Sequence, residues 1–198
     1  MNQPVWHEPA VTRPQRWMRH GLSGATVWLT GLSGSGKSTI ANELARELLN
    51  TSRLAYILDA DNLRHGINND LGYNDSDRTE NIRRVAEVSC LFADAGLVAI
   101  VPIISPFIAS RESARKIHVD KNLRFIEVHV ATPIDECERR DTKGLYAKAR
   151  SGAISGLSGF DSVYEPPKMA EVVVGANNET LAQSVALIMA KLLVRAGQ

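Results

Sequence analysis

The chain has 198 residues, of which 44% are hydrophobic and 23% are charged, and its formal net charge is +1. This composition is typical of one globular domain with a sizeable core. The small net charge excludes a global electrostatic footprint for nucleic acid or for an anionic membrane. Cys90 and Cys137 are too far apart for a zinc-binding pair, and no apolar run reaches membrane-spanning length. We therefore expect a cytoplasmic protein with neither nucleic-acid nor membrane partners.

The first 22 residues are polar and contain three prolines, so we expect an irregular N-terminal extension at 1–22. Trp6 and Trp17 are its candidate contacts with the domain, which we place at 23–198.

A glycine-rich loop follows the first predicted strand, the apolar run Thr26–Thr30. Apolar residues recurring every four positions from Ile40 predict an amphipathic helix after the loop. Between them, the sequence fits the phosphate-binding pattern G-x-x-x-x-G-K-[ST], whose backbone N–H groups hold an anion. Lys37 is expected to reach the β- and γ-phosphates, and the Ser38 hydroxyl to bind Mg²⁺. The predicted ATP-binding residues are Gly31, Leu32, Ser33, Gly34, Ser35, Gly36, Lys37, Ser38 and Thr39.

Further apolar runs predict strands at 54–58, 97–104, 124–130 and 171–174. Helical patterns separate them, and the helix that ends near Gly96 carries a start signature at Asp77 and Glu80. Alternating strands and helices predict an α/β three-layer P-loop fold with a five-stranded parallel sheet.

Two carboxylates and an arginine follow the second strand: Asp59, Asp61 and Arg64. Ligands of parallel sheets bind at the carboxyl ends of the strands, although a solvated turn remains the alternative. We expect Asp61 to orient or deprotonate an acceptor hydroxyl, and Asp59 to lie nearer Mg²⁺.

Cationic residues crowd the first turns of the next helix at Arg78, Arg83 and Arg84. Cations at a helix N-terminus oppose the macrodipole, so either a bound anion offsets that cost or the residues form a solvated charged face.

Five basic residues lie between Arg139 and Arg150, in a segment where glycines recur up to Gly159. A mobile, cationic segment suits a lid that closes over phosphates, and we place it at about 139–159, with Arg140 on the ATP side. An exposed basic loop is the alternative.

These features leave a small kinase as the favoured class. A GTPase would need a guanine-reading Asn-Lys-x-Asp, which the chain lacks, and a transporter-type ATPase would need its own signature.

The motifs resemble one family, the adenylyl-sulfate kinases, in order from Trp6 to about Pro167. The resemblance rests on Gly31–Thr39, 58–66, 77–84, 104–106 and 137–150. It implies transfer of the γ-phosphoryl group of MgATP to the 3′-hydroxyl of adenosine 5′-phosphosulfate. It also suggests a homodimer, which could associate with a sulfate adenylyltransferase.

The resemblance also implies roles for individual residues. Arg64, Arg78 and Asn81 would hold the phosphosulfate side of the acceptor, and Tyr73 would cover its adenine. Ser105 would either form a phosphoenzyme or simply position the acceptor. The predicted catalytic residues are Lys37, Asp61 and Ser105, and the remaining backbone that lines the acceptor pocket is Ile104, Pro106, Lys143, Gly144 and Leu145.

Two positions depart from the family pattern. Ala60 replaces a glycine, which matters only if the backbone there has positive φ. Leu157 replaces an aromatic residue that would stack on the acceptor adenine, so we expect weaker acceptor binding. The alternatives are a kinase for another small hydroxyl acceptor and a catalytically silent nucleotide-binding regulator.

Overall fold

Five parallel strands form one sheet at the centre of the computed structural model, which describes residues 4–5, 7–20 and 23–194. The strand order is β2-β3-β1-β4-β5, and every neighbouring pair is parallel. The predicted α/β fold with a five-stranded parallel sheet is therefore confirmed. The strands are β1 (Ala25–Thr30), β2 (Ala55–Ile57), β3 (Val98–Pro102), β4 (Arg124–Val130) and β5 (Val172–Val174).

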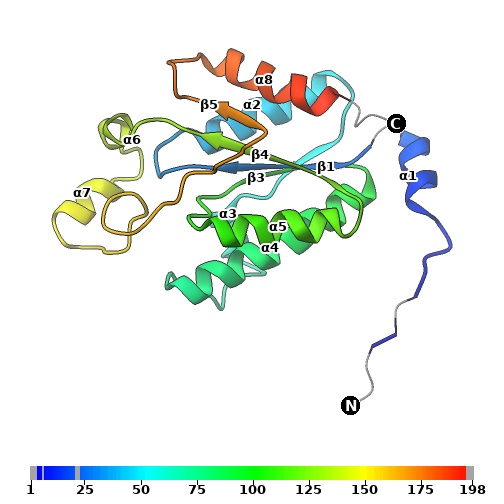
Figure 1. Ribbon diagram of the computed structural model, residues 1–198, viewed down its shortest axis with the longest axis horizontal. Helices are drawn as coiled ribbons and strands as arrows, with labels where there is room; N and C mark the ends of the chain where they lie inside the picture. Colours follow the sequence, from blue (N-terminus) through cyan, green and yellow to red (C-terminus); the bar gives the residue numbers. More distant parts are fainter. Residues whose placement is uncertain (1–3, 6, 21–22, 195–198) are drawn as a thin grey trace.

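Helices cover both faces of the sheet (Figure 1). On one face, α2 (Lys37–Asn50) and α8 (Leu181–Leu193) bury residues such as Leu44 and Ile188 against β1 and β4. On the other, α4 (Asp75–Ala95) and α5 (Ile108–Val119) pack against Trp28 and Phe125. The central strands are buried on both faces, which explains their continuous apolar sequences.

The short helices lie at the carboxyl ends of the strands. They are α3 (Ala60–Leu63), α6 (Ile134–Arg140) and α7 (Leu145–Arg150). Among the described residues, no helix is long and apolar enough to cross a membrane.

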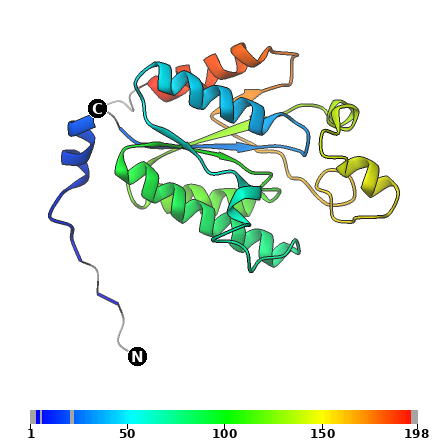
Figure 2. The same cartoon turned by 180° about the vertical axis from the view of Figure 1, so that it is seen from behind.

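The N-terminal extension is more ordered than the sequence predicted. Within it, α1 (Arg13–His20) forms at the opposite end of the molecule from α6 and α7 (Figures 1 and 2). Asp94 on α4 accepts from Arg13 and Arg16, and the Trp17 indole donates to the Asp94 carbonyl at 3.0 Å. The expected contact through Trp17 is thus present, while Trp6 lies outside the described residues.

Helix α4 begins earlier than predicted. Its N-cap is Asn74, whose side chain accepts from the backbone N–H of Asp77 at 2.8 Å, so the start signature at Asp77 was wrong. Asn74, three residues before Asp77, is also a preferred N-cap residue, and it is the one that caps the helix. The predicted end at Gly96 is confirmed, and that glycine has a φ of 103°.

Candidate active site

The glycine-rich loop connects the end of β1 to the start of α2, as predicted. Gly36 caps α2 with a φ of 102°, a conformation that residues with a side chain rarely adopt. At Gly34, a Cβ would lie only 2.9 Å from the carbonyl oxygen of Cys137 in α6. The loop therefore needs glycine both for its turn and for its close contact with α6.

Lys37 is folded back over this loop. Its Nζ donates to the carbonyl oxygens of Gly31 at 2.9 Å and Leu32 at 2.6 Å. Burial is the main reason that the pKa of Lys37 is lowered to about 8. An anion bound in the loop would favour the charged ammonium, so this lysine is poised to respond to a phosphate.

A cavity of about 1000 Å³ opens beside the loop, and Lys37, Ser38 and Thr39 line it. Nearly all predicted acceptor residues also line this cavity; Gly144 does not, and instead caps α7 with a φ of 64°. The predicted residues that the cavity brings together are Asp61, Arg64, Tyr73, Arg78, Asn81, Ile104, Ser105, Pro106, Lys143, Leu145 and Leu157.

The two carboxylates after β2 have different surroundings. Asp59 is the N-cap of α3, and its Oδ1 accepts from the backbone N–H groups of Asp61 and Asn62. Asp61 instead forms an exposed ion pair with Lys143 of the lid, at 2.5 Å. Ala60 lies in the first turn of α3 and has no positive φ, so its departure from the family pattern causes no backbone strain.

The donor set near the loop fits Mg²⁺. Asp59 and Ser38 both line the large cavity and offer a carboxylate and a hydroxyl oxygen. Mg²⁺ is commonly held by one or two such protein ligands, together with substrate phosphates and water.

Two arginines that line the large cavity are bonded to other parts of the chain. Arg64 donates to the carbonyls of Leu71 and Gly72, and its guanidinium lies 4.3 Å from the Tyr73 ring centroid. Arg78 reaches across to the lid, where it donates to the carbonyl of Gly156 at 2.5 Å.

Asn81 is oriented by a neighbour that the sequence analysis did not identify. Its Oδ1 accepts from the Nδ2 of the fully buried Asn68 at 2.9 Å. The amide nitrogen of Asn81 is therefore the atom left to serve as a donor toward the cavity.

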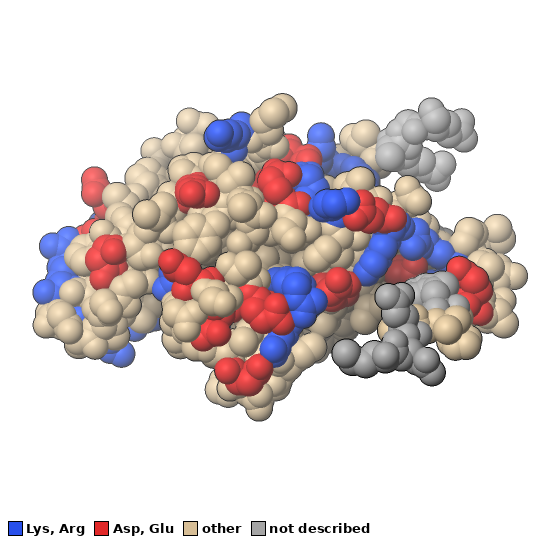
Figure 3. All heavy atoms as spheres, turned by 60° about the horizontal axis from the view of Figure 1, so that its bottom comes forward, with Lys and Arg blue, Asp and Glu red and all other residues tan. Residues whose placement is uncertain are grey.

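The other cations of α4 do not belong to the site. Arg83 and Arg84 both pair with Glu80, and Arg84 also pairs with Asp70. They belong to the solvated charged face that was one of the two alternatives. Acidic and basic side chains are interspersed on this side of the molecule (Figure 3).

Ser105 follows β3 and is only 1% exposed. Its hydroxyl accepts from the indole N–H of Trp28 at 3.1 Å and donates to the Ile103 carbonyl at 3.4 Å. This side chain is thus held by the protein rather than presented to a ligand.

The lid segment 139–159 contains α7 and packs on the glycine-rich loop. Tyr146 donates from its hydroxyl to the Ser33 carbonyl at 3.0 Å and packs with Cys137, Leu32 and Leu157. Leu157 lines the large cavity but is only 7% exposed, because it also packs in this cluster. Its expected contact with an adenine stays a prediction.

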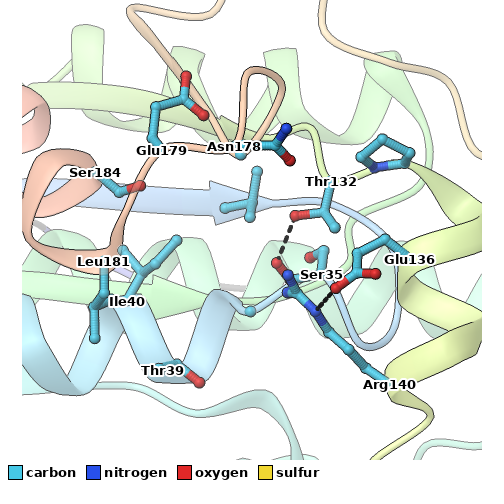
Figure 4. A pocket seen from close by; sticks show the side chains of 14 residues that line it. Ser35, Thr39, Ile40, Thr132, Glu136, Arg140, Asn178, Glu179, Leu181 and Ser184 are labelled. Carbon is cyan, nitrogen blue, oxygen red and sulfur yellow. Dashed lines mark hydrogen bonds and ion pairs between the residues drawn. The ribbon is translucent and has the colours of Figure 1, made fainter.

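A second, smaller cavity of about 330 Å³ adjoins the same loop (Figure 4). Arg140 borders it, and Glu136 holds the Arg140 guanidinium at 2.7 Å. Thr132 donates to the Ser35 carbonyl at 2.8 Å and so ties the end of β4 to the loop. The lining residues that no sequence motif identified include Thr132, Asn178, Glu179, Leu181 and Ser184.

Comparison with known proteins agrees with this geometry. The family model for adenylylsulphate kinase matches residues 23–175. The adenylyl-sulfate kinase of Citrobacter koseri is 54% identical over 85% of this chain and 83% of that protein. The enzyme of Clostridium acetobutylicum is 50% identical over 89% of this chain and 86% of that protein.

A solved structure gives the same result. The Mycobacterium tuberculosis APS kinase CysC, in complex with AMPPNP and APS, is 47% identical and superimposes with a TM-score of 0.84. The superposition covers 86% of this chain and 98% of that one. The chain therefore belongs to the adenylyl-sulfate kinase family of ATP-dependent phosphotransferases.

Proposed function

We propose that this chain transfers the γ-phosphoryl group of MgATP to the 3′-hydroxyl of adenosine 5′-phosphosulfate. The products are ADP and 3′-phosphoadenosine 5′-phosphosulfate. One observation carries the proposal: two cavities meet at one phosphate-binding loop, and Gly36, Thr39 and Arg140 line both of them. A nucleotide in each cavity would direct its reacting group toward Lys37.

The smaller cavity suits the base and ribose of ATP. It is bounded by α2, by Arg140 and by the turn between β5 and α8, and its walls mix apolar and hydrogen-bonding groups (Figure 4). A flat base with a polar edge needs this combination. The triphosphate would then extend over the loop to Lys37 and Ser38.

The larger cavity suits the acceptor. Arg64 and Arg78 supply two guanidinium groups, which match the geometry of phosphate and sulfate oxygens. Asn81 adds an amide donor, and Tyr73, which is 70% exposed, offers a ring face for a base.

Transfer then depends mainly on position and charge. Lys37 stabilises negative charge on the transferred group. Asp61 accepts a hydrogen bond from the attacking hydroxyl once Lys143 shifts toward the acceptor. Ser38 and Asp59 would hold Mg²⁺, which would supply positive charge beside the phosphates. The lid excludes water, which limits hydrolysis of ATP.

Three further expectations stay predictions: a cytoplasmic location, a homodimer, and association with a sulfate adenylyltransferase.

An assay of ADP release with a panel of acceptors tests the proposed function. Adenosine phosphosulfate, AMP, gluconate and shikimate are offered at equal concentration with saturating MgATP. We expect kcat/KM for adenosine phosphosulfate to exceed the others by at least about 100-fold, because losing paired buried polar contacts costs several kcal/mol. Faster turnover of another acceptor would assign a different substrate, and ADP release without any acceptor would indicate an ATPase.

A further inference from the structure

Arg111 on α5 is a buried arginine that connects three parts of the chain. Its side chain is 2% exposed, and its Nε donates to Glu127 of β4 at 2.7 Å. The two terminal nitrogens donate to backbone carbonyls instead, those of Ser105 and Glu165, each at 2.7 Å. Every branch of the guanidinium therefore has an acceptor on a different segment.

One of these carbonyls, that of Ser105, belongs to backbone that lines the acceptor cavity, and the other belongs to a segment bonded to that backbone. Ser105 follows β3 and has a φ of 43°, a conformation that is uncommon outside glycine. Glu165 lies on the return from the lid and is bonded to the same turn, since its N–H donates to the Pro106 carbonyl at 2.8 Å. Its carboxylate also accepts from the backbone N–H of Ile108 at 2.7 Å.

We propose that Arg111 is a positioning residue for the acceptor, acting through the backbone of Ile104–Pro106. This inference rests on the proposed function, which assigns that backbone to the acceptor side. Ile104, Ser105 and Pro106 line the large cavity, whereas Arg111 does not. The guanidinium holds the Ser105 carbonyl in place from behind, and Glu127 in turn fixes the guanidinium.

Lysine cannot replace this arrangement. A guanidinium presents its donors in a rigid planar fork, while an ammonium is a single point on a flexible stem. Arg111→Lys retains a positive charge beside Glu127 but cannot reach both carbonyls at the same time. The turn at Ser105 would then relax, although the buried carboxylate would still have a cationic partner.

Arg115 provides a matched control one turn along α5. It donates to the other oxygen of Glu127 at 3.2 Å and pairs with Glu171 at 2.6 Å. It has no hydrogen bond to Ser105 or Glu165 among the described residues. Arg115→Lys thus perturbs the same buried carboxylate without releasing the backbone that lines the cavity.

The test is steady-state kinetics of both variants, normalised to folded protein by active-site titration. We expect Arg111→Lys to raise KM for adenosine phosphosulfate by about tenfold or more, because small displacements at a reacting site carry large costs. KM for ATP should change less than about twofold, and Arg115→Lys should leave both KM values near wild type. A purely structural role would reduce the yield of folded enzyme without moving either KM.

Three results would overturn the proposal: an unchanged KM for the acceptor, a rise confined to ATP, or an equal rise in Arg115→Lys. If Arg111→Lys does not fold, the double variant Arg111→Met, Glu127→Leu removes both buried charges, a change that proteins often tolerate. This double variant should show the same rise in KM for adenosine phosphosulfate, with little change in KM for ATP. If the wild-type chain does not phosphorylate adenosine phosphosulfate, the proposed function fails, independently of Arg111.

Discussion

At the scale of single residues, the proton on Lys37 reports on phosphate binding. Burial lowers the pKa of Lys37 to about 8 in the free protein. Phosphate charge favours the ammonium and raises that pKa in the complex. Between the two pKa values, the complex holds a proton that the free protein lacks. Binding of ATP at pH 8.5 should therefore take up a proton, and affinity should fall as the pH rises above 8.

Calorimetry in two buffers with different ionisation enthalpies measures this uptake directly. We expect about half a proton or more per ATP at pH 8.5 for the wild type, given the free pKa. Lys37→Arg is the control, because arginine stays charged throughout this range and should remove the uptake. Equal uptake in both proteins would assign the proton to another group.

Asp61 is placed to act on the acceptor hydroxyl. Its side chain pairs with the exposed Lys143 and lines the large cavity, so the carboxylate is accessible to an acceptor. Asp61→Asn should lower kcat by about 100-fold, within the range for loss of a general base, with little change in ATP affinity. Steady-state rates and equilibrium binding of MgATP by the variant test this prediction. Loss of MgATP binding would show that Asp61, rather than Asp59, serves the metal.

Ser105 is expected to position the turn rather than to carry a phosphoryl group. Its hydroxyl is buried and bonded to Trp28 and Ile103, and direct transfer needs no phosphoserine. Ser105→Ala should keep more than about a tenth of wild-type kcat, a loss below ~1.4 kcal/mol. Complete inactivation, with a phosphorylated wild-type protein detected by mass spectrometry after ATP alone, would support an obligatory phosphoenzyme.

At the scale of elements, α1 joins the body through ion pairs with Asp94, through the Trp17 indole, and through hydrogen bonds from Arg13 to the carbonyls of Lys121 and Asn122. Arg13 and Arg16 pair with Asp94 in a partly exposed setting, where each ion pair contributes about 0–1 kcal/mol. Trp17 packs with Cys90, Ala93 and Leu123, and it would contact a Cβ at Gly96. The indole should therefore contribute more than the ion pairs.

We expect Asp94→Ala to lower the unfolding free energy by about 1 kcal/mol and Trp17→Ala to lower it by more, about 2–3 kcal/mol for a half-buried aromatic residue. Denaturant titration measures both. Because α1 lies at the opposite end from the lid, kcat should be unchanged in each variant. A drop in kcat at wild-type stability would connect this helix to the active site.

Sequence patterns identified elements best where one local signal was strong. Continuous apolar runs predicted the buried strands, and β4 has the bounds that its run indicated. Helix α1 was missed because its apolar Trp17 and Met18 are outnumbered by charged and polar residues. Its order comes from Asp94, 77 residues away from Trp17.

In the site, too, residues with a local sequence motif were predicted and residues held by distant partners were not. The glycine loop, the carboxylates after β2 and the lid are sequence motifs, and the fold brings them to one cavity. Asn68, Arg111 and the turn at Asn178 could not be predicted, because their partners are distant in sequence and they carry no motif of their own. The packing of Leu157 with Cys137 and Tyr146 likewise carries no sequence signal, and its contact with the acceptor stays a prediction.

At the scale of the whole molecule, a buried histidine makes stability depend on pH. His118 is fully buried, and its ring contacts Thr26 of β1 and the Ala114 carbonyl, each at 2.8 Å. Burial lowers the pKa of His118 below its usual 6.5. The unfolded chain therefore takes the proton first, so this contribution is present above pH 6.5 and is lost as the pH falls below it.

Denaturant unfolding between pH 5 and 8 tests this dependence, in a range where other groups also titrate. We expect the unfolding free energy to decline below about pH 6.5, and to decline less steeply in His118→Gln. Some slope should remain, because burial lowers the pKa of His129 as well. An identical slope in the variant would exclude His118 as a source.

In the proposed reaction, one phosphoryl group passes from ATP to adenosine 5′-phosphosulfate beside Lys37. The most direct measurement is ³¹P NMR of the product formed from MgATP and adenosine 5′-phosphosulfate. We predict ADP together with one new phosphomonoester resonance coupled to the 3′ proton of the acceptor ribose, and an intact phosphosulfate. Release of inorganic phosphate in place of that resonance, or a phosphoryl group on another oxygen, would contradict the account.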